Sequence, residues 1–331
     1  MSNVVFRSKY KNEMEMFLKF QSERTKSATW QQKRIVLRHF DNFISRRKDN
    51  DLTEDNLHEW ICSLKEKFPN TRNRYISVVR QFLMFFSSVS NMQVYIPSLP
   101  HIDDIFVPYF FSDKEKEAIF RIADDYPSSS QSTMPYIKVE LPMVLRLLES
   151  TGARPSETLL LQMKDIDLER GVLIMKQTKR MKERYIPLSN GMTKILSVYC
   201  RKLGIVDIPN AYVFPRRDFT EHMNRYDLRN KFLCILRQAG ISMKKQPFTG
   251  RGACIYSLRH GFVVSALKRL YSSAMQIDDA LPYLSVYLGH DNFHETEKYV
   301  KFSADVFPDE MEKFHSQIVR ALPDETPWET V

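Results

Sequence analysis

The sequence predicts a mainly α-helical protein in two parts, the second of which carries one small antiparallel sheet of three strands. Apolar residues recur at the spacing of amphipathic helices before residue 95 and again from residue 139 onward. Between residues 172 and 188 the pattern changes to short β-rich runs around a basic polar loop. Pro97, Pro100 and Pro108 mark the joint between the parts, because proline fixes φ and lacks a backbone donor.

Four helices are expected in the first part, and each has one apolar face. Thr53 is a suitable N-cap for the third of them, which we expect to stop at Pro69. The fourth has the strongest helical period. In chain order, the apolar faces are formed by Tyr10, Met14, Phe17 and Leu18; by Leu37, Phe40 and Ile44; by Leu57, Trp60, Ile61 and Leu64; and by Tyr75, Val78, Val79, Phe82, Phe85 and Phe86.

The second part combines helices with a β-hairpin. Two β-rich runs, 172–175 and 184–188, flank the basic loop, and the preceding "MKDIDL" is a candidate for a short first strand. Gly240 suits the C-terminal cap of the helix before it. The helices that we expect in this part cover residues 139–148, 190–203, 228–239 and 257–271.

Composition favours a nucleic-acid partner. The formal net charge of +9 in 331 residues favours a polyanion, and no apolar run approaches the roughly 20 residues that span a bilayer. The widely spaced Cys62, Cys200, Cys234 and Cys254 indicate reduced thiols in a cytosolic protein, without a zinc site or a disulfide framework. With nine glycines and no glycine-rich phosphate loop, nucleotide-driven chemistry is not expected.

Polar side chains gather at the start of the fourth expected helix, at Arg72, Asn73, Arg74 and Arg80. A solvated charged face is the ordinary explanation for such residues. Phosphate contact is the alternative, because side-chain cations and free backbone N–H groups meet at the start of a helix. The four residues are therefore candidates for nucleic-acid contact.

Residues of catalytic type stand in four separated stretches of the second part. Arg154 precedes a proline-started helix, a position where anions are favourably held. Each such residue alone has an ordinary explanation, for example a helix-end salt bridge or a core histidine. The full set in chain order is Arg154, Lys179 in the hairpin loop, Tyr256, Arg259, His290 and Tyr299.

Two arginines, a lysine, a histidine and a tyrosine suffice for phosphoryl transfer without a metal ion. Guanidinium groups bind non-bridging oxygens in bidentate fashion and stabilise the additional charge of the five-coordinate state. A tyrosine hydroxyl is a covalent nucleophile, but with an ordinary pKa of about 10 it needs cations and a proton acceptor nearby. A lysine can protonate the leaving alkoxide.

The same residues carry a resemblance to the tyrosine recombinases of the phage integrase and Xer type, over nearly the whole chain. The family's first box resembles "TGARPSE", which puts a catalytic arginine at Arg154, and its hairpin lysine motif resembles "KRMKER", with Lys179. The second box resembles "YSLRH", with Arg259. The third resembles "LGHDNFHETEKY", with His290 and the nucleophile Tyr299. More narrowly, "DDALPYLSVYLGH" and "VFPDEM" resemble transposon- and phage-encoded integrases.

The resemblance implies a DNA strand transferase that uses neither a cofactor nor a metal. Tyr299 would attack the scissile phosphate, giving a 3′-phosphotyrosyl enzyme and a free 5′-hydroxyl. Arg154 and Arg259 would clamp the phosphate, and His290 would hydrogen-bond to it. Lys179 would protonate the leaving oxygen. The phosphotyrosyl bond keeps the energy of the broken bond, so rejoining would need no ATP.

The chain departs from the family pattern at Tyr256, where the family carries a histidine three positions before the second arginine. A phenol can hydrogen-bond to a phosphate oxygen, but it cannot serve as a base near pH 7. If the position mainly supplies a hydrogen bond, Tyr256 still fills it, and this is the role that we expect. If the position mainly accepts the proton of Tyr299, that task has moved to His260, His290 or water.

The resemblance also implies the roles of the two parts. Residues 1–95 would form a core-DNA-binding domain, 96–108 a proline-rich linker and 109–331 the catalytic domain, closing around duplex DNA. Lys182 and Arg184 of the hairpin join the expected DNA contacts. No further amino-terminal domain is expected, since Tyr10 already begins the helical pattern. The tail after Val300 docks on a neighbouring protomer or packs on its own chain, and both remain open.

The implied partners are double-stranded DNA, further copies of this chain in a homo-tetramer on paired sites, and an accessory DNA-bending or directionality factor. The expected location is the cytoplasm, at the nucleoid. Two alternatives share the fold: a type IB topoisomerase that relaxes DNA as a monomer, and a DNA-binding protein that has lost the chemistry. A basic RNA-binding protein is a third, for which no aromatic platform is visible. The implied outcome is the integration, excision or resolution of DNA.

Overall fold

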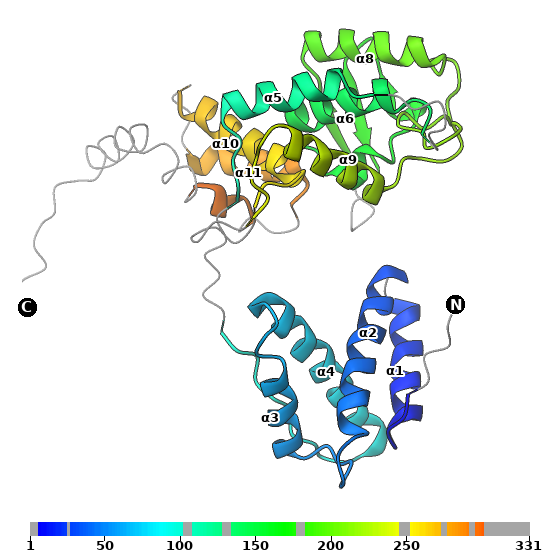
Figure 1. Ribbon diagram of the computed structural model, residues 1–331, viewed down its shortest axis with the longest axis vertical. Helices are drawn as coiled ribbons and strands as arrows, with labels where there is room; N and C mark the ends of the chain where they lie inside the picture. The colour runs from blue at the N-terminus through cyan, green and yellow to red at the C-terminus, as the bar shows by residue number, and fades with distance from the viewer. Residues whose placement is uncertain are drawn as a thin grey trace, which may run out of the picture. The chain divides into compact units, whose positions relative to one another are not determined.

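The computed structural model describes residues 6–24, 27–101, 108–127, 134–176, 183–244, 252–272, 277–290 and 295–300. Over these residues the chain is mainly α-helical with one three-stranded antiparallel sheet, so the predicted fold class is confirmed (Figure 1). The chain divides into two compact units, Met1–Asp104 and Ile105–Val331, each with its own hydrophobic core. None of the helices in the described ranges is long and apolar enough to cross a membrane.

The first unit contains α1 (Lys11–Arg24), α2 (Ser27–Ile44), α3 (Glu54–Ser63) and α4 (Pro69–Ser90). Thr53 caps α3 as predicted, because its hydroxyl accepts a hydrogen bond from the Asn56 N–H at 3.3 Å. Pro69 is also the first residue of α4, where its missing N–H breaks no helical hydrogen bond. The helix α3 itself ends earlier than predicted, at Ser63, so Pro69 begins the next helix and does not end the previous one.

The predicted apolar faces of these helices meet in one core. Phe40, Trp60 and Phe82 are fully buried, and the rings of Phe40 and Trp60 pack edge to face with centroids 5.0 Å apart. Tyr75 and Phe85, which belong to the predicted face of α4, are only partly buried at the margin of this core. The first unit therefore has a core that is independent of the second.

The second unit begins with α5, a helix that starts with a capping box in which Ser112 and Glu115 bind each other's backbone N–H groups. Residues 295–300 are also helical. The elements of this unit are α5 (Asp113–Asp124), α6 (Ile137–Thr151), α7 (Pro155–Thr158), a 3₁₀ turn (Met163–Asp165), β1 (Ile166–Asp167), β2 (Val172–Met175), β3 (Arg184–Pro187), α8 (Asn190–Leu203), α9 (Arg225–Gln238), α10 (Tyr256–Ser272) and α11 (Ile277–Leu288).

The sheet has the strand order β1-β2-β3, with both pairs antiparallel, as the hairpin pattern predicts. Leu173 of β2 pairs with Ile186 of β3, and both side chains are fully buried. The hairpin therefore lays one face on the core of the second unit. Its loop, residues 177–182, lies outside the described residues, and so do Lys179 and Lys182.

The central helix of the second unit is α6, which packs against α5, α8 and α10, while α10 packs against α11 (Figure 1). Gly152 ends α6 with a φ of 61°. A Cβ at this position would lie 2.3 Å from the Phe262 ring of α10, so a side chain here would push the two helices apart. Glycine thus brings the end of α6 close to α10.

Candidate active site

Guanidinium groups from three separate elements donate hydrogen bonds to three successive carbonyls at the end of α11. The last carbonyls of a helix have no partner within the helix and carry partial negative charge, so they attract cations. The end of α11 therefore gathers arginines that are distant in sequence. The pairs are Arg184 Nε with the Tyr287 oxygen (3.0 Å), Arg259 Nη2 with the Leu288 oxygen (3.0 Å) and Arg154 Nη2 with the Gly289 oxygen (2.7 Å).

Arg154 is placed by the helix start that its sequence predicts. It is the N-cap residue of α7, and Pro155 occupies the first helical position. Its Nη1 forms an ion pair with Glu157 Oε1 at 2.9 Å, and its side chain remains 27% exposed. The guanidinium group is therefore fixed on one edge and accessible on another.

Glu157 joins two of the three arginines. Its Oε1 accepts from Arg154, and its Oε2 accepts from Arg184 Nη2 at 2.6 Å. Burial raises the pKa of Glu157, but the hydrogen bond and charge of Arg184, followed by the charge of Arg154, outweigh it and hold the pKa below its usual value. The carboxylate is thus ionised at neutral pH and fixes both guanidinium groups.

We expect Glu157→Gln to lower the free energy of unfolding of the second unit by about 3 kcal/mol, because it removes the counter-charge of a buried guanidinium group. The folded-state pKa of Glu157 lies below its ordinary value of 4.5. The stabilisation is therefore complete above that ordinary value and is lost as the pH falls through the folded-state pKa. Urea denaturation of the full chain at a series of pH values, followed by circular dichroism, measures both effects.

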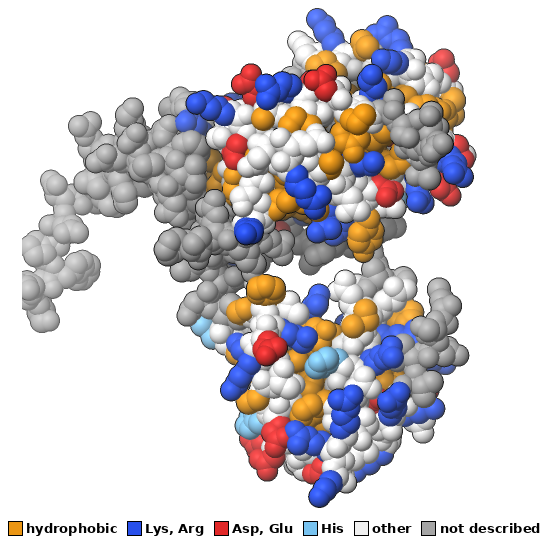
Figure 2. All heavy atoms as spheres, viewed as in Figure 1, with side chains coloured by type: hydrophobic (Ala, Val, Ile, Leu, Met, Phe, Trp, Pro, Cys, Tyr) orange, Lys and Arg blue, Asp and Glu red, His pale blue; other side chains and the backbone are white. Residues whose placement is uncertain are grey.

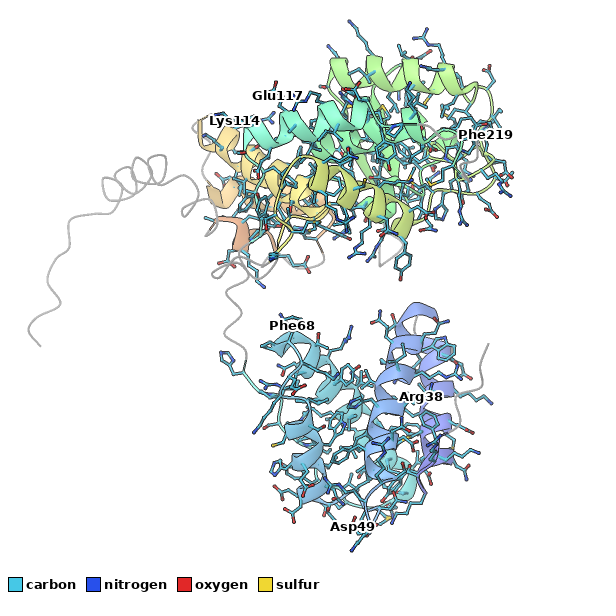
Figure 3. The ribbon with its side chains drawn as sticks, in the orientation of Figure 1. Arg38, Asp49, Phe68, Lys114, Glu117 and Phe219 are labelled. Atoms are coloured by element: carbon cyan, nitrogen blue, oxygen red, sulfur yellow. The ribbon has the colours of Figure 1, made fainter. Side chains whose placement is uncertain are left out.

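Glu117→Gln is the matched control for this prediction, since Glu117 is an exposed residue of α5 (Figure 3). It should change the free energy of unfolding by less than about 0.5 kcal/mol. If the difference between wild type and Glu157→Gln stayed the same down to strongly acidic pH, Glu157 would not be ionised in the folded protein.

Arg259 links the ends of two helices. It is 4% exposed, and its Nη1 donates to the Gly152 carbonyl at 2.6 Å while its Nη2 donates to the Leu288 carbonyl. Burial lowers the pKa of Arg259 to about 10, and the charge of Arg154 adds to this effect. The group still carries its proton at neutral pH, so the site holds a buried positive charge.

His290 is held in its neutral form. Arg259 Nη2 lies 2.9 Å from His290 Nε2, and because arginine only donates, Nε2 accepts. The proton is therefore on Nδ1, which donates to the Thr296 hydroxyl at 2.7 Å. Burial lowers the pKa of His290 to about 3, and the charges of Arg259 and Arg154 act in the same direction.

Tyr299 is a packing residue whose hydroxyl also reaches the polar site. It is 8% exposed and lies in a small apolar cluster with Val263 of α10 and Leu288 of α11. Its hydroxyl lies 2.6 Å from His260 Nδ1, and its ring stacks on that of His290 with centroids 6.4 Å apart. The ring is thus fixed by packing, while the oxygen faces His260.

The Tyr299 hydroxyl is neutral in this setting. Burial raises the pKa of Tyr299 to about 12, although the charges of Arg259 and Arg154 oppose the shift. The charge of Arg154 also acts on the pKa of Arg259 and of His290. The four groups therefore belong to one site, and this site has the cations to bind a phosphodiester beside a phenol.

Tyr256 is the first residue of α10, three positions before Arg259. It is half-buried against the main core of the second unit. Within the part of the chain that the structure describes, its hydroxyl has no hydrogen-bond partner.

The hairpin residues of the predicted site are placed differently from one another. Lys179 and Lys182 lie outside the described residues. Arg184, which we expected among the DNA contacts, is 7% exposed and paired with Glu157. This placement makes it an internal support of the arginine cluster.

Two of the four candidate residues on α4 hold the segment that follows this helix. Asn73 donates to the Pro100 carbonyl at 2.8 Å, and Arg80 donates to the Pro97 carbonyl. Their hydrogen bonds fix the start of the proline-rich stretch. The other two candidates are Arg72, which is half-buried, and Arg74, which is exposed.

Sequence reasoning missed Glu157 and Gly289. Glu157 stands three positions after Arg154 at a proline-started helix, and a capping-box search would have found it. Gly289 has a φ of 64°, and a Cβ there would lie 2.8 Å from Arg184 Nη1. Only the folded structure reveals that close approach.

In the described ranges, no group of three or more histidine, cysteine, aspartate and glutamate side chains is arranged to hold a metal ion. The charges that the described site presents are those of guanidinium groups, with one carboxylate that holds them. Such a site can bind an anion and stabilise negative charge that develops on it.

Comparisons with known proteins identify relatives of the chain. The phage integrase family model matches residues 111–305. The chain is 26% identical to the integrase/recombinase y4rE of Sinorhizobium fredii over 174 residues, which are 52% of this chain and 54% of that protein. It is 25% identical to the tyrosine recombinase XerC of Staphylococcus haemolyticus over 241 residues, which are 70% of this chain and 71% of that protein. The matched region spans about half the length of y4rE.

Solved structures show the same fold. One is the XerH site-specific recombinase bound to a palindromic difH substrate, with a TM-score of 0.66, 17% identity, and coverage of 94% of this chain and 91% of that chain. Another is a lambda integrase dimer bound to a COC′ core site, with a TM-score of 0.63, 13% identity, and coverage of 85% and 95%.

Proposed function

The chain belongs to the phage integrase family, and from this premise we propose that it is a site-specific tyrosine recombinase that cuts and rejoins duplex DNA. The observation behind this proposal is that Arg154 and Arg259 meet at the end of α11. His290 and the Tyr299 hydroxyl lie beside them. Fixed guanidinium groups beside a buried phenol suit the attack of that phenol on a phosphodiester.

In the proposed reaction the Tyr299 oxygen attacks the scissile phosphate, forms a 3′-phosphotyrosyl bond and releases a 5′ oxygen. Arg154 and Arg259 bind the non-bridging oxygens and stabilise the five-coordinate state. Lys179 protonates the leaving oxygen. A 5′-hydroxyl of another strand then attacks the phosphotyrosine and rejoins the DNA, which makes the exchange independent of ATP.

His290 changes its hydrogen bonds when the phosphate arrives. Its Nε2 accepts from Arg259 in this structure, and a nitrogen that accepts cannot donate to a phosphate oxygen. The phosphate charge raises the pKa of His290 from about 3 and draws Arg259 toward the phosphate. Protonation of Nε2 then supplies the donor that a phosphate contact requires.

Double-stranded DNA is the proposed partner. The net charge of +9 favours it, and lysine and arginine side chains are spread over the visible face of each unit (Figure 2). The structures of XerH and lambda integrase named above contain their own DNA sites. We propose that this chain acts as a homo-tetramer on paired sites at the nucleoid, with an accessory factor setting direction, and that it integrates, excises or resolves a mobile element.

A covalent-complex assay tests the proposed function. The full-length protein is incubated with duplexes selected by binding from a randomised library, each nicked so that the released 5′ end diffuses away. A protein–DNA complex that resists detergent is expected. Its absence on every bound duplex would leave a DNA-binding protein without the chemistry. A second assay measures strand exchange between two labelled duplexes. Exchange by a tetramer indicates recombination, whereas relaxation of DNA by a monomer would indicate the type IB topoisomerase activity.

Tyr256→Phe is expected to slow cleavage by about 10- to 150-fold, because it removes one hydrogen bond to a charged phosphate, about 1.5–3 kcal/mol. Tyr256 begins the same helix as Arg259, three positions before it, and this position supports the role. Single-turnover cleavage of the nicked duplex measures the effect. Tyr256→His keeps a donor and should retain more of the rate. If Tyr256→Phe cleaved DNA at the wild-type rate, the Tyr256 hydroxyl would have no role in the reaction.

A further inference from the structure

We propose that His260 is the general base of the cleavage step and takes the proton of the Tyr299 hydroxyl; this rests on the recombinase function proposed above. His260 Nδ1 lies 2.6 Å from the Tyr299 oxygen, which is within the distance that direct proton transfer requires. The two ring centroids are 5.6 Å apart. Because His260 directly follows Arg259 on α10, one turn of helix carries both a phosphate clamp and the base.

The other polar groups around the phenol are unsuited to this task. His290 Nε2 accepts from Arg259 and its Nδ1 donates to the Thr296 hydroxyl, and once Nε2 is protonated for the phosphate contact, neither ring nitrogen can take a further proton. Tyr256 occupies the family's histidine position, but a phenol is not a base near pH 7. Glu157 uses both of its oxygens to hold arginines. Among the described residues, His260 is the group that contacts the phenol oxygen through a ring nitrogen able to accept its proton.

Tyr299 needs a base because burial raises its pKa to about 12. Near pH 7.5, a phenol with that pKa is ionised to only about 3 parts in 10⁵. A base in direct contact removes the proton as the bond to phosphorus forms, so free phenolate need not accumulate. For Nδ1 to accept the proton, His260 must carry its own hydrogen on Nε2.

The step balances in atoms and charge. The Tyr299 O–H bond breaks and its proton moves to His260 Nδ1, while the tyrosine oxygen forms a bond to phosphorus. The bond from phosphorus to the 5′ oxygen breaks, and that oxygen takes a proton from Lys179. On rejoining, the 5′-hydroxyl returns its proton to Lys179, and the imidazolium of His260 returns its proton to the leaving tyrosine oxygen.

His260→Asn and His260→Ala separate proton transfer from positioning. The amide oxygen of the asparagine variant accepts the phenol hydrogen bond, but it does not take a proton near neutral pH. Both variants should slow single-turnover cleavage of the nicked duplex by about 10²- to 10³-fold, with the residual adduct still at Tyr299. If His260→Asn cleaved at the wild-type rate, His260 would only position Tyr299 and the proposal would be overturned.

The pH dependence of cleavage gives a second readout. The wild-type rate should level off once the imidazole is neutral, whereas the His260→Asn rate should rise about tenfold per pH unit, because hydroxide then removes the proton. Parallel profiles for the two proteins would overturn the proposal. Among the described residues, the titratable and charged groups that act on Tyr299 are His260 and Arg259 on α10, His290 after α11, Arg154 before α7, and Glu295 on its own helix. Of these, His260 is the one that differs between the two proteins.

Nitrogen NMR of the wild-type protein with isotope-labelled histidine tests the tautomer without a substitution at His260. Its Nδ1 should resonate as an unprotonated nitrogen whose shift changes in Tyr299→Phe, and a protonated Nδ1 would overturn the proposal. The control His222→Asn changes a half-buried histidine that contacts the Met223 carbonyl, and it should cleave as wild type does. If the wild-type protein forms no covalent complex with DNA, the proposed recombinase function is wrong. If the wild type cleaves, and His260→Asn cleaves slowly with a pH profile parallel to that of the wild type, only the assignment of His260 as the base is wrong.

Discussion

Tyr299→Phe is expected to abolish covalent attachment to DNA, lowering the single-turnover cleavage rate on the order of 10⁶-fold, because it removes the nucleophile itself. The substitution deletes one oxygen and keeps the ring in its apolar cluster with α10 and α11. The hydrogen bond to His260 is lost, at a cost of about 1 kcal/mol in stability. Folding and DNA affinity should therefore survive.

Peptide mapping of adducts on a nicked duplex, together with DNA affinity and circular dichroism, checks this result. Tyr283→Phe is the matched control, since Tyr283 lies on α11 and is 75% exposed. It should form adducts at the wild-type rate. If adducts persisted in Tyr299→Phe and mapped to Tyr283 or Tyr287, Tyr299 would not be the nucleophile.

Arg259→Lys is expected to lower the cleavage rate by about 10⁴-fold, as when a charge-stabilising arginine is removed from phosphoryl transfer. Lysine keeps the positive charge. It has no planar fork, however, and cannot reach the Gly152 and Leu288 carbonyls while it also binds a phosphate. The loss should appear in the rate of the chemical step, with DNA affinity changed much less.

Arg201→Lys controls for the exchange of arginine for lysine, since Arg201 is an exposed residue of α8. It should leave the single-turnover rate unchanged, and circular dichroism should show both variants folded. A folded Arg259→Lys protein that cleaves within about tenfold of wild type would mean that charge alone, without the fork, serves the phosphate.

Helices and strands whose apolar residues recur with a clear period were predicted well. The helices α5 and α11 were not predicted, because charged residues in α5 and a proline in α11 obscure that period. The bounds of β2 and α8 agree with the expected 172–175 and 190–203. The sequence "DKEKEAIFRIAD" of α5 has few apolar positions, and Ile119 and Ala123 are the buried ones that its helix turns inward. The helix α11 contains Pro282, which argues against a helix in a sequence, yet buried leucines on its inner face hold it in place.

The candidate site divides along a similar line. Side chains that belong to motifs, such as Arg154 and His290, were named from the sequence. Their partners at residues 287–289 are backbone carbonyls, which every residue carries, so only the fold decides which of them meet a guanidinium group. From the sequence, His260 was one of several candidates for the proton acceptor. The sequence does not show which histidine nitrogen lies next to the Tyr299 hydroxyl.

The carbonyls that bind the arginines come late in the chain, so the arginine cluster can assemble only after α11 has been synthesised. Arg154 is synthesised 135 residues before the Gly289 carbonyl that orients it, and Arg184 precedes its carbonyl partner at Tyr287 by 103 residues. The first unit has its own core and is complete on the ribosome long before α11 emerges. A growing or prematurely terminated chain that lacks α11 therefore has no assembled arginine cluster, and under the function proposed above it should not cleave DNA.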